Sequence, residues 1–321
     1  MKLSLTLSPS PHVHSRSSTA VLMRDVCIAL VPALVWAIVQ FGWRCLRTTV
    51  FSAVACVVLE WAYRRAMKKD CTIGDWSAVV TGVLLAFVCP ADIPYWMLLA
   101  GDAFAVVLVK QLFGGIGMNI VNPALAARAF LMFGWPTRMS GAVYGLPDAM
   151  SAATPMQALH GSGLPADVSL LDAFLGRVGG CIGEISVLML LLGGAYLVVR
   201  RVITLRIPLA YLATVAVLAF VFPRGNDRLV WTAWQLCSGG LLLGAVFMAT
   251  DYTTSPVTHG GQIAFGIGCG AVTILIRYFG SYVEGVSFAI LVMNCCVGFF
   301  DKLGLPKRFG LQRVKKGGDA L

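Results

Sequence analysis

Ionisable side chains inside long apolar runs are the first candidates for chemistry in this sequence. A charged group at the centre of a membrane helix costs roughly 2.5–3.5 kcal/mol on insertion scales, so it needs a function or a partner. Such groups stand within or beside apolar runs at Glu60, Asp102, Arg128, Glu184, Asp251 and Glu284. Asp102 either serves ions or protons or forms a structural pair with Arg128. Glu60 precedes Arg64 by one helical turn, which favours a carboxylate that reaches the membrane interface.

From this set we take four acids as candidate residues of an ion path: Asp102, Glu184, Asp251 and Glu284. Two further segments have residue types that bind or carry small molecules. The glycine-rich stretch 114–123 precedes an apolar run, and its backbone N–H groups could receive an anion at a helix start. A re-entrant turn with close helix packing is the alternative. In the stretch 151–155, Thr154 supplies a hydroxyl before a proline, and by itself this pattern indicates a turn.

Composition shows what kind of molecule must position these groups. Apolar residues make up 58% of the 321 residues and charged residues 12%, with a mean hydropathy of +0.80. A soluble domain has about 25% charged and 45–50% apolar residues, so a soluble enzyme and a disordered chain are excluded. Ten membrane crossings of about 20 residues would use roughly 200 residues, which matches the apolar content. We therefore predict an all-α polytopic membrane protein of about ten transmembrane helices.

The apolar runs predict where the ten spans lie. They cover residues 26–43, 48–63, 76–89, 95–109, 120–135, 180–199, 207–222, 229–249, 261–276 and 285–300. The third and fourth are shorter than a full crossing, which is typical of broken helices around a central site in transporters built from repeats.

The distribution of basic residues predicts the orientation. With the N-terminus inside, the cytoplasmic segments have 17 Lys and Arg and the outer segments 7, so both termini are expected in the cytoplasm. The polar N-terminal segment has no apolar stretch of signal-peptide type and is expected to stay as an arm. The net charge of +10 forms no basic stripe with interleaved aromatics, so it does not indicate nucleic-acid binding.

The ten cysteines form no CxxC pair and have no histidine at ligand spacing. Zinc and iron–sulfur sites are therefore unsupported, and the cysteines are interpreted as small apolar core residues.

A weak internal similarity suggests two repeats. The segment that starts at Trp76 resembles the one that starts at Trp234, and Phe113-Gly-Gly resembles Phe279-Gly-Ser. Five spans per half would place the copies in opposite orientations, as an inverted repeat. The expected organisation is a cytoplasmic arm at 1–25, a first repeat at 26–135, an outer loop at 136–179, a second repeat at 180–300 and a basic cytoplasmic tail at 301–321.

Several segments together resemble the RnfD/NqrB family, the membrane subunits of the Rnf complex and of the Na⁺-translocating NADH:quinone oxidoreductase. The length and the short N-terminal arm are more similar to RnfD than to NqrB. In chain order, the matching segments are Ser10-Pro-His12, Ser77–Ala86, Lys110-Gln-Leu-Phe-Gly-Gly-Ile-Gly-Met-Asn-Ile-Val-Asn-Pro-Ala124, Ser151-Ala-Ala-Thr-Pro155, Gly183-Glu-Ile-Ser186, Phe247-Met-Ala-Thr-Asp251 and Gly280–Ile290.

The resemblance implies a covalent cofactor. In the family, FMN is attached by a phosphoester to the threonine of a Ser-Gly-Ala-Thr-type motif, which carries over to Thr154, with Ser151 and Ala153 as motif residues. Ala152 stands where the motif usually has glycine. By analogy with NqrB there is room for a second, non-covalent flavin (riboflavin), and quinone is a further candidate partner.

The resemblance also implies a fold and a role. The fold would be a 5+5 inverted repeat of the urea-transporter type in the bacterial inner membrane. Electrons from ferredoxin or NADH would pass through partner subunits (A, B, C, E and G) to an extracytoplasmic flavin. A change of flavin charge would then alter the energetics of nearby ions. The alternatives are a cofactor-free channel or transporter, and a structural anchor with Thr154 unmodified.

Overall fold

Helices are the only regular elements in the part of the chain that the computed structural model describes, residues 18–139, 155–161, 163–165, 168–225 and 227–303. The elements up to the long outer segment are α1 (Thr19–Phe41), α2 (Arg44–Ala66), the 3₁₀ turn η1 (Ile73–Asp75), α3 (Ser77–Phe87), α4 (Tyr95–Ala103), the π-helical η2 (Phe104–Gln111) and α5 (Pro123–Gly134). The segment 136–179, which is expected on the outer side, has α6 (Pro136–Met139), α7 (Pro155–His160) and α8 (Leu170–Leu175). After it come α9 (Val187–Val199), α10 (Arg206–Val221), α11 (Arg228–Cys237), α12 (Leu241–Leu243), the π-helical η3 (Gly244–Met248), α13 (His259–Phe279), α14 (Val286–Cys295) and α15 (Val297–Leu303).

Three of these helices, α1, α2 and α13, are long and apolar enough to cross a membrane alone. The pair α11 and α12–η3 passes the same test together but is bent by 62° at its break. The helices α3, α5, α9, α10 and α14 are apolar and shorter. The prediction of an all-helical, polytopic membrane protein is confirmed, and each of the ten apolar runs contains at least one helix.

The outer face of α1 shows why these helices need a lipid environment. Val31, Val35 and Val39 lie on its exposed side, and Val39 is 68% exposed. A helix of a soluble protein has polar residues on such a face. The opposite face, with Ala29, Leu30, Ala33 and Ala37, is buried against the rest of the bundle.

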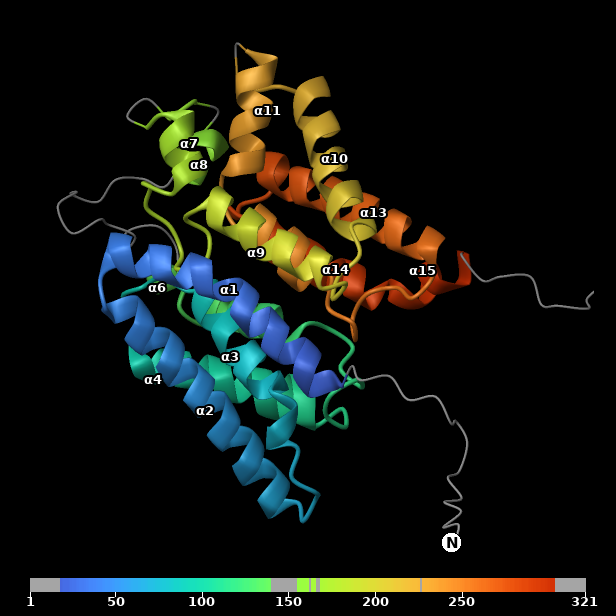
Figure 1. Cartoon of the computed structure of the whole chain (residues 1–321). Helices are drawn as coiled ribbons and strands as arrows, with labels where there is room; N and C mark the ends of the chain where they lie inside the picture. Colours follow the sequence, from blue (N-terminus) through green and yellow to red (C-terminus); the bar gives the residue numbers. More distant parts are fainter. Residues whose placement is uncertain (1–17, 140–154, 162, 166–167, 226, 304–321) are drawn as a thin grey trace, which may run out of the picture.

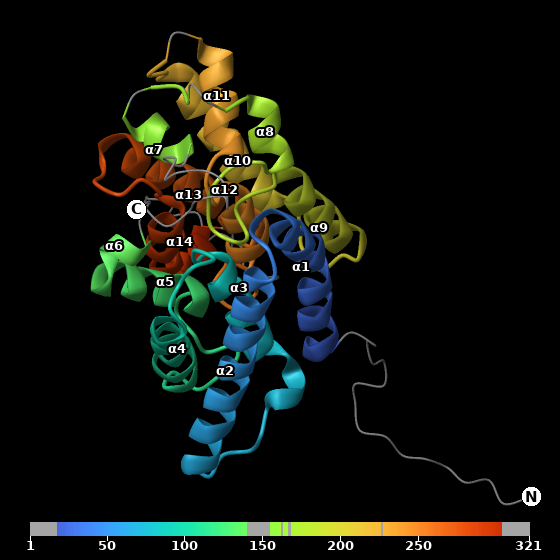
Figure 2. The same ribbon diagram turned by 90° about the vertical axis from the view of Figure 1, so that its left-hand side faces the viewer.

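The helices gather in two groups (Figures 1 and 2). In the first, α2 packs against α3 and the α4–η2 helix, and α5 packs against both α3 and η2. In the second, α10 packs against α11 and α13, and α13 against α14. The groups meet where α1 lies beside α9 and where α5 contacts α14. The short helix α8 packs on α9 and α11 at one end of the bundle.

The glycine-rich stretch before α5 is a turn. Gly114, Gly115 and Gly117 have φ values of 122°, 100° and 89°, which residues with a side chain rarely adopt. The helix start itself is already capped, because the Asn122 side chain accepts hydrogen bonds from the first free N–H groups of α5. Of the two interpretations of this stretch, the structure supports the turn and not an open anion site.

Candidate functional site

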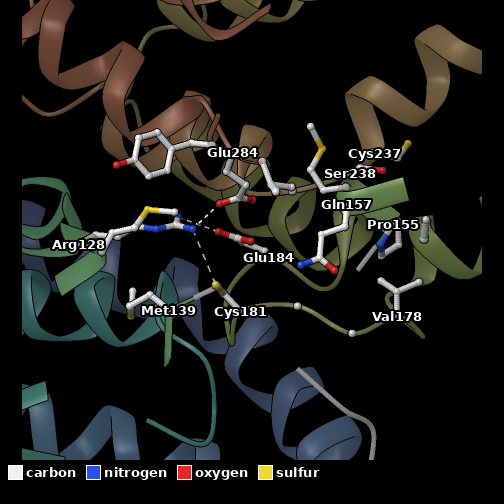
Figure 3. Close-up of a pocket in the computed structure, with 18 of the residues that line it drawn as sticks. Arg128, Met139, Pro155, Gln157, Val178, Cys181, Glu184, Cys237, Ser238 and Glu284 are labelled. Carbon is white, nitrogen blue, oxygen red and sulfur yellow. Dashed lines mark hydrogen bonds and ion pairs between the residues drawn. The ribbon is translucent and has the colours of Figure 1, made fainter. Parts of the chain in front are cut away.

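A cavity of about 290 Å³ opens between the two helix groups at the end of the bundle where α7 and α8 lie (Figure 3). Its walls come from α5, α7, the segment before α9, the break between α11 and α12, and the segment before α14. Apolar residues form much of the wall, and a few polar groups point inward. Residues that line it include Met132, Pro155, Met156, Val178, Cys181 and Tyr282.

An arginine bridges two glutamates at the deep side of this cavity. The Nη1 atom of Arg128 is 2.9 Å from Glu184 Oε1, and its Nη2 atom contacts Glu284 Oε2. The three side chains are nearly buried, with 6% of Arg128, 6% of Glu184 and 12% of Glu284 exposed. Nη2 also lies 3.9 Å from the sulfur of Cys181 (Figure 3).

Main-chain contacts hold the two glutamates in place. The N–H groups of Ile182 and Gly183 donate to the carbonyls of Cys89 (3.2 Å) and Phe87 (2.8 Å) at the end of α3. These two bonds position Glu184, which follows directly in the chain. Glu284 accepts a hydrogen bond of 2.8 Å from the N–H of Gly240, just before α12 begins. A carboxylate at this position also suits the positive end of the helix dipole.

Two glycines leave space for the carboxylates of Glu184 and Glu284 to lie close to the backbone. Gly239 has φ +70°, and a Cβ there would lie 2.7 Å from Glu284 Oε1. A Cβ at Gly240 would lie 2.7 Å from Glu184 Oε1. The break between α11 and α12 therefore has glycines because backbone and carboxylates come too close for any side chain. Sequence reasoning missed these two residues, although paired glycines inside an apolar run were a local signal.

A second arginine contributes to the charge of this site. Arg128 contributes one positive charge against the two negative charges of Glu184 and Glu284 when both are ionised. Arg277 also interacts electrostatically with both glutamates, and its Nη2 atom lies on the same side of Gly239 as the Glu284 carboxylate. Charges interact more strongly in a buried site than in water. The net charge next to the cavity therefore depends on the protonation of the two glutamates.

A second polar cluster lies between α2, α3 and η2. Lys110 Nζ donates to Glu60 Oε2 (2.8 Å) and to Ser77 Oγ (2.6 Å). Gln111 Nε2 and Thr72 Oγ1 each donate to Glu60 Oε1 at 2.9 Å. Glu60 is 1% exposed, so the expectation that it reaches the membrane interface is wrong. Packing of η2 against α2 brings a lysine beside it, and this contact is not visible in the local sequence.

The candidate ion-path acids fall in three separate places. Glu184 and Glu284 meet at Arg128, as described above. Asp102 is fully buried and its hydrogen-bond partners are Ser52 and Cys56, so the alternative in which it pairs with Arg128 is wrong.

Asp251 lines a different cavity of about 80 Å³. Its carboxylate accepts hydrogen bonds from the hydroxyls of Thr253 (3.0 Å) and Thr254 (3.3 Å). Lys110 and Asn122 also line this cavity, which places Asp251 near the Glu60 cluster rather than near Arg128.

Arg277 directly follows the predicted span 261–276, and the structure shows it buried at the end of α13. Its Nη1 atom donates to the carbonyl (2.7 Å) and the side-chain oxygen (3.0 Å) of Gln235, and Nη2 to the carbonyl of Ser238 (3.1 Å). These bonds fix the break between α11 and α12. No local signal marks this role, because the partners are about 40 residues away.

The expected flavin residues Ser151, Ala153 and Thr154 lie outside the described residues. The residue that follows them, Pro155, is the first residue of α7 and lines the cavity beside Arg128, as do Met156 and Gln157.

Comparison with known proteins identifies the relatives of this chain. A family model described as the NQR2, RnfD, RnfE family matches residues 6–310. The chain is 45% identical to the D subunit of the Na(+)-translocating ferredoxin:NAD(+) oxidoreductase complex of Acetobacterium woodii, over 98% of both chains. It is 39% identical to the D subunit of the proton-translocating ferredoxin:NAD(+) oxidoreductase complex of Clostridium ljungdahlii, over 96% of this chain and 97% of that one. It is 36% identical to the D subunit of the ion-translocating oxidoreductase complex of Stutzerimonas stutzeri, over 92% and 93%. The chain belongs to the NQR2, RnfD, RnfE family.

Proposed function

We propose that this chain is the D-type membrane subunit of a multi-subunit ferredoxin:NAD⁺ oxidoreductase that couples electron transfer to ion translocation, and that it carries FMN as a phosphoester on Thr154. The redox role is supported by relatives of 45% and 39% identity that cover nearly the whole chain and are named as such subunits. One of these names specifies Na⁺ and the other protons, so either cation is a candidate for this chain.

The cavity that starts directly after Thr154 is the observation that carries the flavin assignment. Its volume of about 290 Å³ is just below the range of about 300–1,000 Å³ for small-molecule sites. A wall rich in apolar side chains, with Met132, Met156, Val178 and Tyr282, suits a flat aromatic ring, and Gln157 offers it a polar contact. These residues fit an isoalloxazine ring tethered at Thr154. When bound, the flavin would supply reversible electron acceptance.

Through the Arg128 site, a charge in the cavity would change the affinity of Glu184 and Glu284 for an ion. Glu184 and Glu284 both line the cavity, and both interact with Arg128 and with Arg277. Their affinity for a proton or Na⁺ depends on any other charge placed in the same poorly solvated space. We include them with Asp102 and Asp251 in the ion path of the proposed complex.

Ten spans in a 5+5 inverted repeat, with both termini in the cytoplasm of a bacterial inner membrane, form part of the proposal. Two ion pairs support the expectation about which segments share a side of the membrane. Asp25 at the start of α1 pairs with Arg200 at the end of α9, and both belong to segments expected on the cytoplasmic side. Arg44 pairs with Asp92, and both are expected on the outer side. The proposed partners are lipid and the A, B, C, E and G subunits.

A second flavin and a quinone are not part of the proposal. The cavity beside Asp251 holds about 80 Å³, well below the range for organic ligands. Its lining of Lys110, Asn119, Asn122 and Asp251 suits a small ion or water better.

The flavin assignment is tested with the complete complex, expressed together with a flavin transferase. We expect the wild-type subunit to show flavin fluorescence in the denatured band and a Thr154 peptide with the mass of an FMN phosphoester. The variant Thr154→Val should lose both signals, because it has no hydroxyl. Thr137→Val, which removes an exposed hydroxyl from the same outer segment, should keep them.

A colourless wild-type band, or fluorescence that persists in Thr154→Val, would refute the assignment. Normal electron flow through the Thr154→Val complex would favour the structural anchor instead. Ion or solute flux without redox dependence would favour the channel.

A further inference from the structure

Polar side chains follow one buried face of α2 through the first helix group. Ser52, Cys56 and Glu60 are spaced four residues apart and are each at most 1% exposed. The neighbouring α4–η2 helix supplies the partners, because Asp102 contacts Ser52 and Lys110 contacts Glu60. Both pairs are separated by 50 residues, so the two helices run parallel in register. At 1.5 Å per residue the two contacts lie about 12 Å apart along α2.

Asp102 lies at the Ser52 end of this row and has no basic partner among the described residues. Its side chain is 0% exposed. Oδ1 is 2.6 Å from Ser52 Oγ and 3.3 Å from Cys56 Sγ, whereas Oδ2 has no hydrogen-bond partner among the described residues. An ionised carboxylate buried without a counter-charge is strongly disfavoured. Asp102 also stands just before the chain changes to the π-helical η2, a geometry found often at functional sites.

The two contacts of Ser52 relate its single proton to the state of Asp102. The Ser52 oxygen lies 2.9 Å from the carbonyl oxygen of Gly82 and 2.6 Å from Asp102 Oδ1. A serine hydroxyl has one proton and can donate only one of these bonds, while a carbonyl can only accept. If Ser52 donates to Gly82, the bond to Asp102 needs a proton on the carboxyl group.

We infer that Asp102 holds a proton at neutral pH and is a reversible proton-binding site, in which the carboxyl group donates to Ser52 and Ser52 donates to Gly82. A metal cation fits the same place poorly. Hard cations take several oxygen ligands, whereas the partners of Asp102 among the described residues are one hydroxyl and the thiol of Cys56, and the Gly82 carbonyl contacts Ser52.

The other titratable groups around Asp102 do not replace the proton. Cys56 faces it from α2, and Cys89 lies beyond the end of α3. Lys110 on η2 is paired with Glu60, and Arg128 on α5 is held by two glutamates. No side chain among the described residues brings a positive charge within hydrogen-bond distance of Asp102.

The row of polar groups extends from Asp102 toward the end of α2 that is expected in the cytoplasm. From Asp102 it leads through Cys56 to the Glu60–Lys110 pair, and Glu60 is followed by Arg64 near the end of α2 expected in the cytoplasm. Asp102 is thus placed to exchange a proton with the cytoplasmic side. A role in transport rests on the proposed function, whereas the protonation of Asp102 does not.

Protonation is tested on the purified wild-type complex with dicyclohexylcarbodiimide, which modifies carboxyl groups that are protonated in apolar surroundings. Peptide mass spectrometry should show Asp102 labelled at neutral pH, with labelling lost as the pH is raised. Asp92, which pairs with Arg44 at the surface, should stay unlabelled and is the matched control. Absence of label at Asp102 at neutral pH would overturn the inference.

Infrared spectroscopy of the same complex gives a second readout. The wild type should show the carbonyl stretch of a neutral carboxylic acid, and Asp102→Asn should lose it while Asp92→Asn keeps it. An unchanged band in Asp102→Asn would also overturn the inference. If Asp102→Asn does not assemble, the pH dependence of the wild-type label decides alone.

A separate measurement tests the role of Asp102 in transport. In the assembled Asp102→Asn complex we expect the number of ions translocated per electron to fall, with flavin still on Thr154. Unchanged translocation would remove Asp102 from the path but leave the proposed function intact. Absence of flavin from the wild type would instead refute the proposed flavin assignment, without touching the protonation result.

Discussion

Arg128 Nη1 and Glu184 Oε1 are 2.9 Å apart, although 56 residues separate them in the chain. The contact joins α5 of the first helix group to the segment that precedes α9, and through Glu284 it extends to the segment before α14. One guanidinium thus links three parts of the molecule around the cavity. The following predictions address this site and the polar contacts that support it.

Replacing Arg128 should destabilise the subunit strongly. Arg128→Met removes the cation that contacts both buried glutamates directly, and loss of one partner of a buried pair costs about 3–5 kcal/mol. The melting temperature of the purified complex measures this effect. The double variant Arg128→Met/Glu184→Gln should recover part of the loss, because one uncompensated charge is gone. A melting temperature equal to that of the wild type would show that the contact does not contribute to stability.

A methyl group at Gly240 should displace Glu184. In Gly240→Ala the new Cβ would lie 2.7 Å from Glu184 Oε1, and such overpacking costs about 1–3 kcal/mol. We expect a lower melting temperature and a lower rate of ion translocation. Gly298→Ala is the matched control, since no atom lies within 4 Å of a Cβ there. Equal behaviour of the two variants would contradict the packing argument.

The Glu60–Lys110 pair should behave as a coupled unit. Lys110→Met removes the 2.8 Å ion pair of the buried Glu60 and leaves it only the longer contact of 3.8 Å to Arg64, with an expected cost of up to about 3–5 kcal/mol. Glu60→Gln/Lys110→Met removes both charges and should be less destabilised than the sum of the single variants. Thermal unfolding of the four proteins gives the coupling energy, expected at about 0.5–3 kcal/mol for contacting residues. Additive effects would mean that the two side chains do not interact.

Loss of the cap on α5 should weaken the helix that carries Arg128. Asn122 Oδ1 accepts from the N–H groups of Ala124 (3.0 Å) and Leu125 (3.3 Å), so Asn122→Ala should cost about 1 kcal/mol. Asn122→Ser keeps an uncharged side-chain acceptor and should retain more of the stability than Asn122→Ala. Hydrogen exchange at the start of α5 would measure the difference, and equal protection in both variants would argue against a capping role.

Much of the architecture follows from sequence alone. Length, apolar content and the spacing of apolar runs predict a membrane protein whose runs each contain a helix, because whether a segment is helical in lipid depends on its own composition. The family could also be identified, because its motifs are contiguous stretches such as 110–124. The individual acids Asp102, Glu184, Asp251 and Glu284 were singled out because any ionisable residue in an apolar run is conspicuous.

The partners of those residues could be decided only by the tertiary structure. Arg128 lies with Glu184 and Glu284 and not with Asp102, and Glu60 is buried beside Lys110 rather than directed to the interface. The physical reason is that a buried charge is satisfied by whichever helix packs against it. The partner residue is 50 or more positions away in the sequence in each of these cases, so the contact cannot be predicted from the local sequence.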